Sequence, residues 1–258
     1  MQFFQPSTLF TGQKLIQLAR VDSTNSYAMQ LLHQSHKPPE GTAIMAEEQT
    51  RGRGQREQTW IAEKGKNLTL SYIFYPGFLS LKHQFDLNIA VALAVAETIQ
   101  SFTEQKVEIK WPNDILINSR KVAGILIENS IQGENIAFSI VGMGINCNQK
   151  GFDYDKAPNA TSIFNITGLV TPIDKVFATL SEFLEKRYLQ LRAGKQAAFM
   201  DDYLERLYHF NSWQNYLFKE SPLKAKIIGV SPIGRLQLLT EQNAVLEADL
   251  KEIKFIFP

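Results

Sequence analysis

The stretch "FDLNIAVALAVAETIQSF", residues 85–102, decides the fold. On a helix, its apolar residues occupy nearly the whole circumference rather than a single stripe. A helix that is apolar all round has to be covered on every side by other parts of the protein. The stretch therefore predicts a central buried helix, around which the remaining elements are expected to pack.

Strands are expected on both sides of this helix, because apolar runs of strand-like composition flank it. They occur at 14–21, 41–48, 67–76, 107–117, 121–130 and 136–147. The segment "IQGEN" between the last two predicts a hairpin. Apolar residues at helical spacing predict further helices, at 24–34 (with a capping residue in Asp22-Ser23), 172–192 and 195–209. The order of these elements is that of an α+β protein with antiparallel hairpins.

The pattern changes near residue 213, where short strands separated by turn residues replace the helices. This tail predicts a small β-barrel, joined to the preceding chain without a flexible linker. We therefore expect two domains, at 1–212 and 213–258.

Composition and charge exclude several classes of protein. Lys and Arg number 27 and Asp and Glu number 26, so the net charge is +1, whereas nucleic-acid-binding proteins usually have a strong basic excess. The start "MQFFQPSTLF" has no basic segment followed by a long apolar run, and the apolar run near 89–96 is too short to span a bilayer. The single cysteine, Cys147, fits a reducing compartment. We expect a cytoplasmic protein that binds neither DNA nor membranes.

Familiar catalytic patterns are absent from the sequence. There is no G-x-x-x-x-G-K-[ST] phosphate loop, and "GMGINC" lacks the third glycine of a dinucleotide fingerprint. Four scattered histidines give no metal-ligand set. Cys147 is expected to be a small packing residue rather than a nucleophile.

The stretch "EEQTRGRGQREQTW", residues 47–60, has the composition of a ligand-binding loop. Gly52 and Gly54 allow a close approach of the backbone to a ligand. Arg51, Arg53 and Arg56 supply permanent charge and fork-shaped donors that suit carboxylates and phosphates. Backbone N–H groups of such a turn can also form an anion nest. Taken alone, the loop is equally compatible with a solvated surface loop or an RGG-like nucleic-acid segment.

Two further stretches carry polar residues next to apolar strands. In "IKWPNDILINSRKVAGILIE" (109–128), Asn113 and Asp114 follow a rigid Trp-Pro turn, and Lys121 begins an apolar strand, where a lone cation is costly unless it faces an anion. Gly124 leaves room for a flat ligand to approach that strand. An ordinary turn and an exposed edge lysine are the alternatives. In "VGMGINCN" (141–148), Asn146 either reads a base edge or caps a turn.

These stretches together resemble the biotin protein ligase family. The matching motifs occur in the family's order, as "DSTN" (22–25), "AEEQTRGRGQREQTW" (46–60), "KWPND" with "RKVAGILIE" (110–128) and "GMGIN" (142–146). The resemblance covers nearly the whole chain. It implies a class II aminoacyl-tRNA-synthetase-like α+β catalytic domain, with a mixed sheet and helices, followed by a small C-terminal SH3-like β-barrel.

The resemblance also implies an ATP-dependent reaction in two steps. The carboxylate of biotin attacks the α-phosphate of MgATP, which gives biotinyl-5′-AMP and pyrophosphate. The amine of one lysine on a biotin carboxyl carrier domain of a biotin-dependent carboxylase then attacks this anhydride and releases AMP. Biotin, ATP and Mg²⁺ are the expected ligands, and the protein is expected to be a monomer or a homodimer.

The roles of individual residues follow from the same resemblance. Lys121 and Arg53 are expected to be catalytic, with Lys121 bridging the biotin carboxylate and the α-phosphate. The expected biotin-binding residues are Ser23, Thr24, Asn25, Gln49, Arg53, Gly54, Gln55, Lys121 and Gly124. The expected ATP- and adenylate-binding residues are Arg53, Arg56, Trp60, Lys110, Asn113 and Asn146. Asp114 is expected to help hold Mg²⁺, and Trp60 and Trp111 belong either to the pocket walls or to the core.

The chain departs from the family pattern in the loop and at its start. Gln55 stands where some members carry Arg, and Glu57 where Gly is common, which puts the triphosphate contacts of the loop in doubt. Lys64 and Lys66 are candidates to compensate. The motif "DSTN" begins after 21 residues, which leaves no room for an N-terminal winged helix-turn-helix. A lipoate ligase or octanoyltransferase of the same fold, or a non-catalytic biotin sensor, is the alternative.

Overall fold

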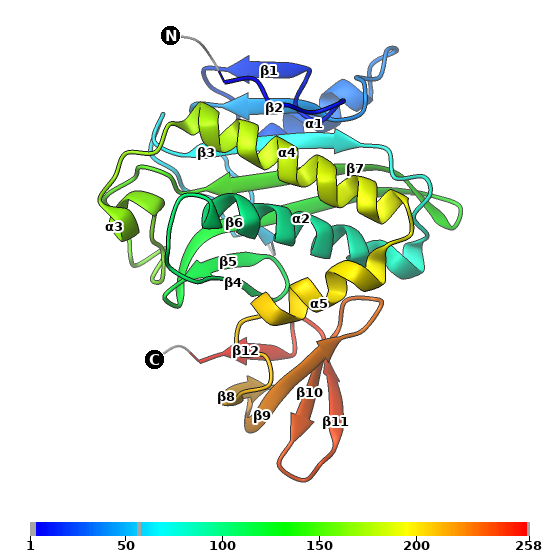
Figure 1. The fold of residues 1–258 in the computed structure, drawn as a ribbon, viewed down its shortest axis with the longest axis vertical. Coiled ribbons are helices and arrows are strands. Elements are labelled where there is room, and N and C mark those ends of the chain that lie inside the picture. Colours follow the sequence, from blue (N-terminus) through cyan, green and yellow to red (C-terminus); the bar gives the residue numbers. More distant parts are fainter. Residues whose placement is uncertain (1–3, 56–57, 257–258) are drawn as a thin grey trace.

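A computed structural model describes residues 4–55 and 58–256, and the side chains of all of these except 197 and 198. The elements follow one another along the chain as Figure 1 labels them. In order, they are β1 (Leu15–Leu18), α1 (Thr24–Leu32), β2 (Thr42–Ala46), β3 (Leu68–Phe74), the 3₁₀ turn η2 (Leu81–His83), α2 (Gln84–Gln100), β4 (Val107–Lys110), β5 (Asp114–Ile117), β6 (Arg120–Gln132), β7 (Asn135–Ile145), α3 (Ile163–Thr167), α4 (Ile173–Arg192), α5 (Gln196–Arg206), β8 (Trp213–Phe218), β9 (Ser221–Val230), β10 (Leu236–Thr240), β11 (Val245–Ala248) and β12 (Ile253–Phe255).

Within the described residues, the first seven strands form one mixed sheet in the order β1-β2-β3-β7-β6-β5-β4. β1 pairs with β2 in parallel, and every other neighbouring pair is antiparallel. The long hairpin β6–β7 that "IQGEN" predicts is confirmed, and it forms the centre of the sheet. Together with the helices, this sheet confirms the predicted α+β class.

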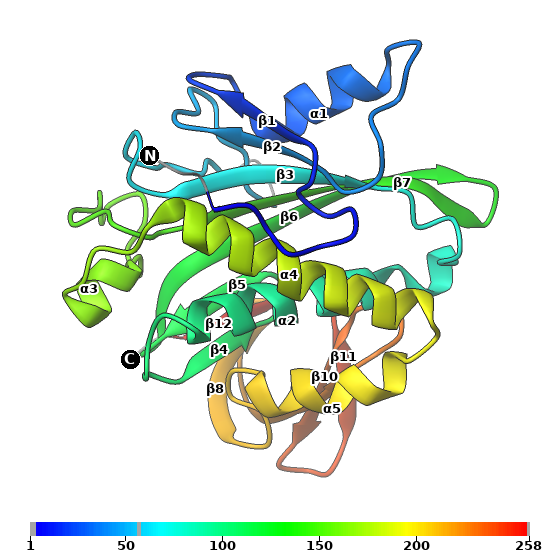
Figure 2. The same ribbon diagram turned by 45° about the horizontal axis from the view of Figure 1, so that its top comes forward.

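The two faces of this sheet have different neighbours because side chains alternate along each strand. On β3, Leu70, Tyr72 and Phe74 belong to the main core, which includes α2 and α4. Ile73 belongs to a smaller cluster with α1, and Ser71 on the same face bonds to the first residues of α1. Figure 2 shows α1 and α4 on opposite sides of β3. The sheet therefore has a fully packed face and a face that is only partly covered.

Helix α2 is the buried helix that 85–102 predicts. It packs against α4, α5 and strands β4 to β6, and its side chains from Leu87 to Ala96 are buried, apart from the partly exposed Asn88. Because it is covered on all sides, it fixes the position of the strands that carry the site.

The last five strands form a separate antiparallel sheet in the order β11-β10-β9-β8-β12 among the described residues. This confirms the small C-terminal β unit, which lies below β4 and α5 in Figure 1. It is tied to the larger part by the Trp111 indole, whose Nε1 donates to the carbonyl of Gly234 at 2.9 Å. The ring of Phe85 occupies the space where Gly234 has no side chain. The exact boundary at 212/213 stays a prediction.

Three local features differ from the sequence-based expectations. The first strand is shorter than 14–21, and the short helix α3 was not expected. Ser23 is the residue before α1, as a cap would be, but its side chain makes no capping hydrogen bond. It lines a cavity instead, as described below. Among the described residues, no helix is long and apolar enough to cross a membrane.

Candidate active site

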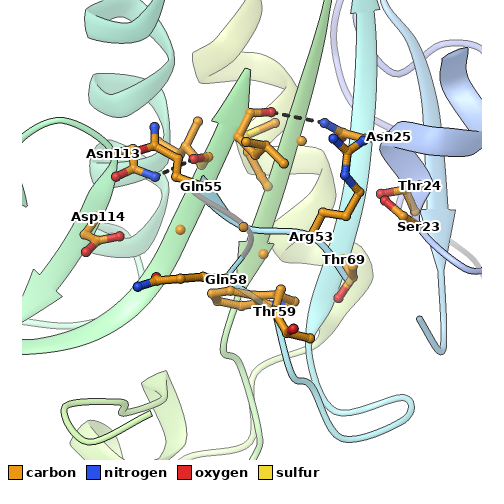
Figure 3. A pocket seen from close by; sticks show the side chains of 18 of the residues that line it. Ser23, Thr24, Asn25, Arg53, Gln55, Gln58, Thr59, Thr69, Asn113 and Asp114 are labelled. Carbon is orange, nitrogen blue, oxygen red and sulfur yellow. Dashed lines mark hydrogen bonds between the residues drawn. The ribbon is translucent and has the colours of Figure 1, made fainter. Parts of the chain in front are cut away.

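A cavity of about 200 Å³ opens on the partly covered face of the large sheet. Its walls come from the start of α1, the loop before β3, the strands β3, β6 and β7, and the turn between β4 and β5. Leu250, from the C-terminal unit, adds to the wall. Figure 3 shows Ser23, Thr24, Asn25 and Arg53 toward one end of this first cavity, and Asp114 with Asn113 toward the other.

The first cavity brings together nearly all of the residues that the sequence analysis singles out. Those that line it are Ser23, Thr24, Asn25, Gln49, Arg53, Gly54, Gln55, Trp60, Lys110, Asn113, Asp114, Lys121 and Gly124. Asn146 lies outside it and lines a neighbouring cavity. Arg56 and Glu57 lie outside the described residues, so their predicted roles stay predictions.

A carboxylate between two ammonium groups forms the charged end of the first cavity. Lys121 Nζ lies 2.6 Å from Asp114 Oδ1, and Lys110 Nζ lies 3.1 Å from Asp114 Oδ2. Burial raises the pKa of the Asp114 carboxyl, but the two ammonium groups outweigh burial and hold the pKa below its ordinary value of 3.8. The cluster therefore carries two positive charges and one negative charge, and it presents a net cation to the cavity.

The position of Lys121 is fixed by backbone bonds on both of its sides. Its N–H donates to the carbonyl of Asn159 at 2.6 Å, and its carbonyl accepts from the N–H of Thr161 at 2.8 Å. The pairing of β5 with β6 also shifts by one residue between Ile115 and Leu116. The backbone of Lys121, near the start of β6, is therefore held between β5 and the segment before α3, which fixes the point from which its side chain extends.

Trp60 lies flat against two strands that have no side chains in its way. A Cβ on Gly144 would overlap the indole ring, and a Cβ on Gly124 would come within 3.1 Å of both the ring and the Lys121 side chain. Lys121 Nζ lies 5.7 Å from the centroid of the indole, a distance at which a cation and an aromatic face attract each other. The two glycines thus make room for the Trp60 ring, and Gly124 also lines the first cavity.

The opposite end of the first cavity is neutral and hydrogen-bonded. Gln49 Oε1 lies 2.7 Å from the N–H of Thr24 and 3.1 Å from its hydroxyl. The buried Ser71 hydroxyl lies 2.7 Å from Thr24 Oγ1 and 2.6 Å from Asn25 Oδ1. A Cβ on Gly142 would overlap the Asn25 amide. The start of α1 is therefore hydrogen-bonded to β3, and Gly142 on β7 leaves room for the Asn25 side chain.

The described parts of the loop, residues 51–55 and 58–60, are held to each other by backbone bonds. Trp60 N–H donates to the Gly52 carbonyl at 3.0 Å, and Gly54 N–H donates to the Gln58 carbonyl at 2.7 Å. The Gly54 donor is therefore used within the loop and is not part of an anion nest. The Arg53 guanidinium makes two hydrogen bonds to the Glu128 carboxylate on β6, at 3.1 and 2.8 Å. Arg53 is thus a fork-shaped donor, as expected, but to a carboxylate of the protein itself.

A second cavity of about 770 Å³ shares part of its wall with the first. The shared residues are Gln58, Thr59, Trp60, Lys110, Asp114 and Lys121. The rest of its wall includes Asn146 and the segment 156–160. Among the described residues, the buried atoms Trp60 Nε1 and Asn146 Oδ1 have no hydrogen-bond partner. Buried polar atoms in native proteins nearly always have partners, and these two atoms belong to residues that line the second cavity.

Three of the predicted residues have structural partners that the sequence did not reveal. The Asn113 side chain donates to the Ile125 carbonyl at 2.7 Å, which ties the β4–β5 turn to β6. The Asn146 amide donates to the Thr161 carbonyl at 2.9 Å, while its oxygen is left for another partner. Trp111 is buried and binds the C-terminal unit, so it belongs to the core and not to the cavity wall.

Sequence reasoning missed Ser71, Glu128 and Leu250. Ser71 and Glu128 alternate with core residues on β3 and β6, which is a pattern that also fits a solvated strand face. Leu250 lies in the turn between β11 and β12, more than a hundred residues from the nearest motif. The sequence offered one signal for these residues. Glu128 directly follows the apolar strand segment in "GILIE", which places a carboxylate next to residues expected to be buried.

The described residues do not fit a magnesium site built by the protein. No group of three His, Cys, Asp or Glu side chains among them is placed to hold a metal ion. Both oxygens of Asp114 contact lysine ammonium groups, so this carboxylate serves as a partner for the lysines. Cys147 is buried, and burial raises its pKa to about 12, which leaves the thiol protonated and fits the predicted packing role.

Comparison with known proteins assigns the chain to a family. Residues 18–146 match the model of the biotin/lipoate A/B protein ligase family, which is half of the chain and includes all four motifs. The chain belongs to this family. The predicted family is thereby confirmed, and the first cavity lies within the matched part, apart from Leu250.

Members of the ligase family with assigned activities are similar to this chain over part of their length. A bifunctional ligase/repressor of Bacillus spizizenii is 34% identical over 187 residues, which cover 72% of this chain and 57% of that protein. A biotin–[acetyl-CoA-carboxylase] ligase of Paracoccus denitrificans is 37% identical over 131 residues, which cover 50% of this chain and 52% of that protein. The chain thus spans about half the length of the curated relatives it matches.

A solved structure of the ligase family extends the similarity to nearly the whole chain. The biotin protein ligase from Aquifex aeolicus in complex with biotin and ATP superposes with a TM-score of 0.79 at 26% identity. The superposition covers 94% of this chain and 98% of that one. The predicted catalytic fold with a small C-terminal β unit is confirmed by this match.

Proposed function

We propose that this protein is a biotin protein ligase, which attaches biotin to a lysine of a biotin carboxyl carrier domain through biotinyl-5′-AMP. One observation carries the proposal. Lys121 Nζ lies on the wall that the two cavities share, with Lys110 and Asp114 beside it. A ligase that joins a carboxylic acid to a nucleotide needs a cation at the point where the acid site meets the nucleotide site.

The neutral end of the first cavity suits the ring system of biotin. The ureido group of biotin is uncharged and offers both N–H donors and a carbonyl acceptor. Thr24, Asn25 and Gln49 present hydroxyl and amide groups there. The opposite end, at Lys121, suits the valerate carboxylate. The polarity of the cavity thus runs from neutral to cationic, as the polarity of biotin runs from neutral to anionic.

The second cavity suits ATP. Its volume of about 770 Å³ is in the range of small-ligand pockets. Trp60 Nε1 and Asn146 Oδ1 offer a donor and an acceptor there that have no partner among the described residues. The bound ATP complex of the Aquifex aeolicus relative supports this assignment. Magnesium would then arrive with the phosphates, which are its usual ligands.

In the first step, an oxygen of the biotin carboxylate attacks the α-phosphorus of ATP, and the bond from that phosphorus to the pyrophosphate oxygen breaks. Two anions have to meet in this encounter, so fixed positive charge lowers the barrier. Lys121 supplies this charge at the junction, and Lys110 adds to it. Asp114 holds the two ammonium groups in place, so they do not have to reorganise during the reaction.

In the second step, the uncharged amine of a carrier lysine attacks the acyl carbon of biotinyl-5′-AMP. The C–O bond to the phosphate breaks, AMP leaves, and the amine loses its proton as the amide forms. Lys121 contacts the leaving phosphate in this step and stabilises its charge. The carrier is proposed from the activity for which the Paracoccus denitrificans relative is named, and not from a surface of this chain.

The test is the transfer of radiolabelled biotin to a purified carrier domain in the presence of MgATP. Parallel reactions contain labelled lipoate or octanoate instead of biotin, because the family includes lipoate ligases. Label on the carrier with biotin alone supports the proposal. Label with lipoate or octanoate but not with biotin would replace it by a lipoyl or octanoyl activity. Biotin binding without any transfer would indicate a non-catalytic sensor.

A further inference from the structure

Glu128 holds together two parts of the neutral end of the first cavity without lining that cavity. Arg53 donates to both of its oxygens, and Asn25 Nδ2 donates to Oε2 at 2.7 Å. Arg53 belongs to the loop, Asn25 to α1 and Glu128 to β6. Figure 3 shows Arg53 and Asn25 next to each other at this end. One carboxylate therefore links three segments.

The Glu128 carboxylate fixes which way the Asn25 amide points. Carboxylate oxygens only accept hydrogen bonds, so the NH₂ group of Asn25 has to face Glu128. The same NH₂ group also donates to the carbonyl of Leu126 at 3.3 Å. Asn25 Oδ1 is consequently turned toward Ser71.

The orientation of Asn25 then determines the direction of the next two hydrogen bonds. Ser71 has one hydroxyl hydrogen, and Asn25 Oδ1, at 2.6 Å, can only accept it. The Thr24 hydroxyl lies 2.7 Å from the Ser71 oxygen and 3.1 Å from Gln49 Oε1, so its single hydrogen is used by an acceptor of the protein. Gln49 Oε1 still accepts from the backbone N–H of Thr24.

The result is a row of hydrogen-bond acceptors on the cavity wall. The Thr24 and Asn25 oxygens keep lone pairs but have no hydrogen left to donate. If the Asn25 amide were reversed, its NH₂ group, a donor, would take the place of Oδ1 beside Ser71. Ser71 would then donate to Thr24, and Thr24 would donate to Gln49 Oε1. Glu128 thus controls whether this end accepts from a ligand or donates to it.

We propose that Glu128 is a positioning residue that orients this chain of hydrogen bonds and so makes the cavity selective for a ligand with ring N–H donors. The inference rests on the proposed function, in which the ureido group of biotin supplies those donors. Glu128 acts through Asn25 and not by contact with the ligand. Its pairing with Arg53 is a separate effect on the loop.

The experiment replaces Glu128 by two side chains of similar length. Glu128→Met removes both carboxylate oxygens and leaves the Asn25 NH₂ group only the longer bond to the Leu126 carbonyl, whereas Glu128→Gln keeps one side-chain oxygen that can still accept from Asn25. Biotin and a biotin analogue methylated on a ureido nitrogen are compared as substrates in carrier labelling. Because the Lys121 end is untouched, we expect KM to change and kcat to stay within about threefold in both variants.

Loss of one oriented hydrogen bond changes affinity by about threefold to tenfold. We therefore expect Glu128→Met to raise the KM for biotin about tenfold and to shrink the preference for biotin over the methylated analogue. Glu128→Gln should recover part of both losses. Glu128 has two effects, one on the loop through Arg53 and one on Asn25. Arg53→Met separates them, because it removes the two hydrogen bonds from the guanidinium to Glu128 but leaves the bond from Asn25. It should keep the preference for biotin.

Glu108→Gln is the matched control, since it removes a carboxylate that pairs with Lys106 on another strand of the same sheet. It should leave both constants unchanged. If wild-type protein labels the carrier with biotin and Glu128→Met has the same KM and the same preference, the role of Glu128 is refuted and the proposed function stands. If Arg53→Met loses the preference as much as Glu128→Met does, Glu128 only fastens the loop. A wild-type protein that transfers no biotin refutes the proposed function itself.

Discussion

The two ends of the first cavity are built from opposite kinds of polar group. Around Asp114, two lysines and a carboxylate form a cluster of full charges. Around Ser71, hydroxyl and amide groups form a network, and the charge of Arg53 at this end is balanced by its ion pair with Glu128. The difference follows the proposed reaction, because charge develops only where the acid meets the phosphate. The neutral ring of biotin is recognised instead by hydrogen bonds whose donors and acceptors match those of the ring.

The two ends also differ in how the chain supports them. Asp114 is the first residue of β5 and Lys121 the second residue of β6, and both strands contact the largely buried helix α2. The neutral end depends on the first turn of α1 and on the loop that contains Arg53. We therefore expect substitutions at the charged end to change chemistry, and substitutions at the neutral end to change binding and retention.

The largest effect is expected from Lys121→Ala. This change removes the cation between the two cavities while Lys110 still pairs with Asp114, so the fold should persist. Deleting one preorganised electrostatic group typically costs about a hundredfold or more in rate. The measurement is biotin-dependent exchange of labelled pyrophosphate into ATP. Lys106→Ala, which removes a lysine from an exposed ion pair, is the control. Exchange near the wild-type rate in Lys121→Ala would remove Lys121 from the mechanism.

A smaller effect on both ends is expected from Gly144→Ala. The added methyl group would overlap the Trp60 ring, which forms a wall of both cavities. Overpacking of this kind costs about 1–3 kcal/mol, and displacement of the ring should reduce carrier labelling about tenfold. The control is Gly151→Ala, because a Cβ at Gly151 meets nothing within 4 Å. Equal activity and melting temperature in the two variants would show that the Trp60 ring can move aside without loss of activity or stability.

The neutral end is tested by Arg53→Gly. The change keeps the backbone permissive but removes the fork to Glu128 that fastens the loop. A loop that closes over a reactive anhydride retains it and excludes water. We expect a few-fold increase in free biotinyl-5′-AMP and in label on unintended amines. Hydrogen exchange of residues 50–55 with and without biotin provides the second measurement. Slow exchange without ligand that biotin leaves unchanged would show a preformed wall instead of a closing loop.

The smallest effect is a change in the pH dependence of stability in Asp114→Asn. The folded-state pKa of Asp114 is lowered, so its contribution to stability is present above the unfolded value near 3.8 and is lost as the pH falls further. The difference in melting temperature between wild type and variant should therefore be larger at neutral pH than in the acid range below that value. Thermal unfolding at a series of pH values measures this difference. A constant difference would mean that the lysines do not stabilise the charged carboxylate.

Much of the fold was predictable because local patterns decide it. The apolar circumference of 85–102 predicted the buried helix, and "IQGEN" predicted the central hairpin. The order of strands in the sheet was not predictable in the same way. β7 lies between β3 and β6 through contacts between residues that are far apart in the sequence, and no short pattern carries that information.

The candidate site shows the same division. Motif residues such as Lys121 and Asn25 were found because their types and spacing suggested chemistry. Ser71 and Glu128 were missed because a polar residue that alternates with core residues also fits a solvated strand face. The reason for Gly144 was missed as well, because it depends on a tryptophan from a distant loop. Partners of the motif residues thus became visible only in three dimensions.

The central claim is that the carboxylate of biotin is joined to the α-phosphate beside Lys121. The most direct measurement uses biotin with both carboxylate oxygens replaced by oxygen-18, followed by mass analysis of the AMP released after transfer to the carrier. One carboxylate oxygen bridges the acyl carbon and the phosphorus in the anhydride, and it leaves with the phosphate when the amine attacks the carbon. The account predicts one oxygen-18 atom in each AMP. Unlabelled AMP, with both labelled oxygens retained or lost to water, would contradict it.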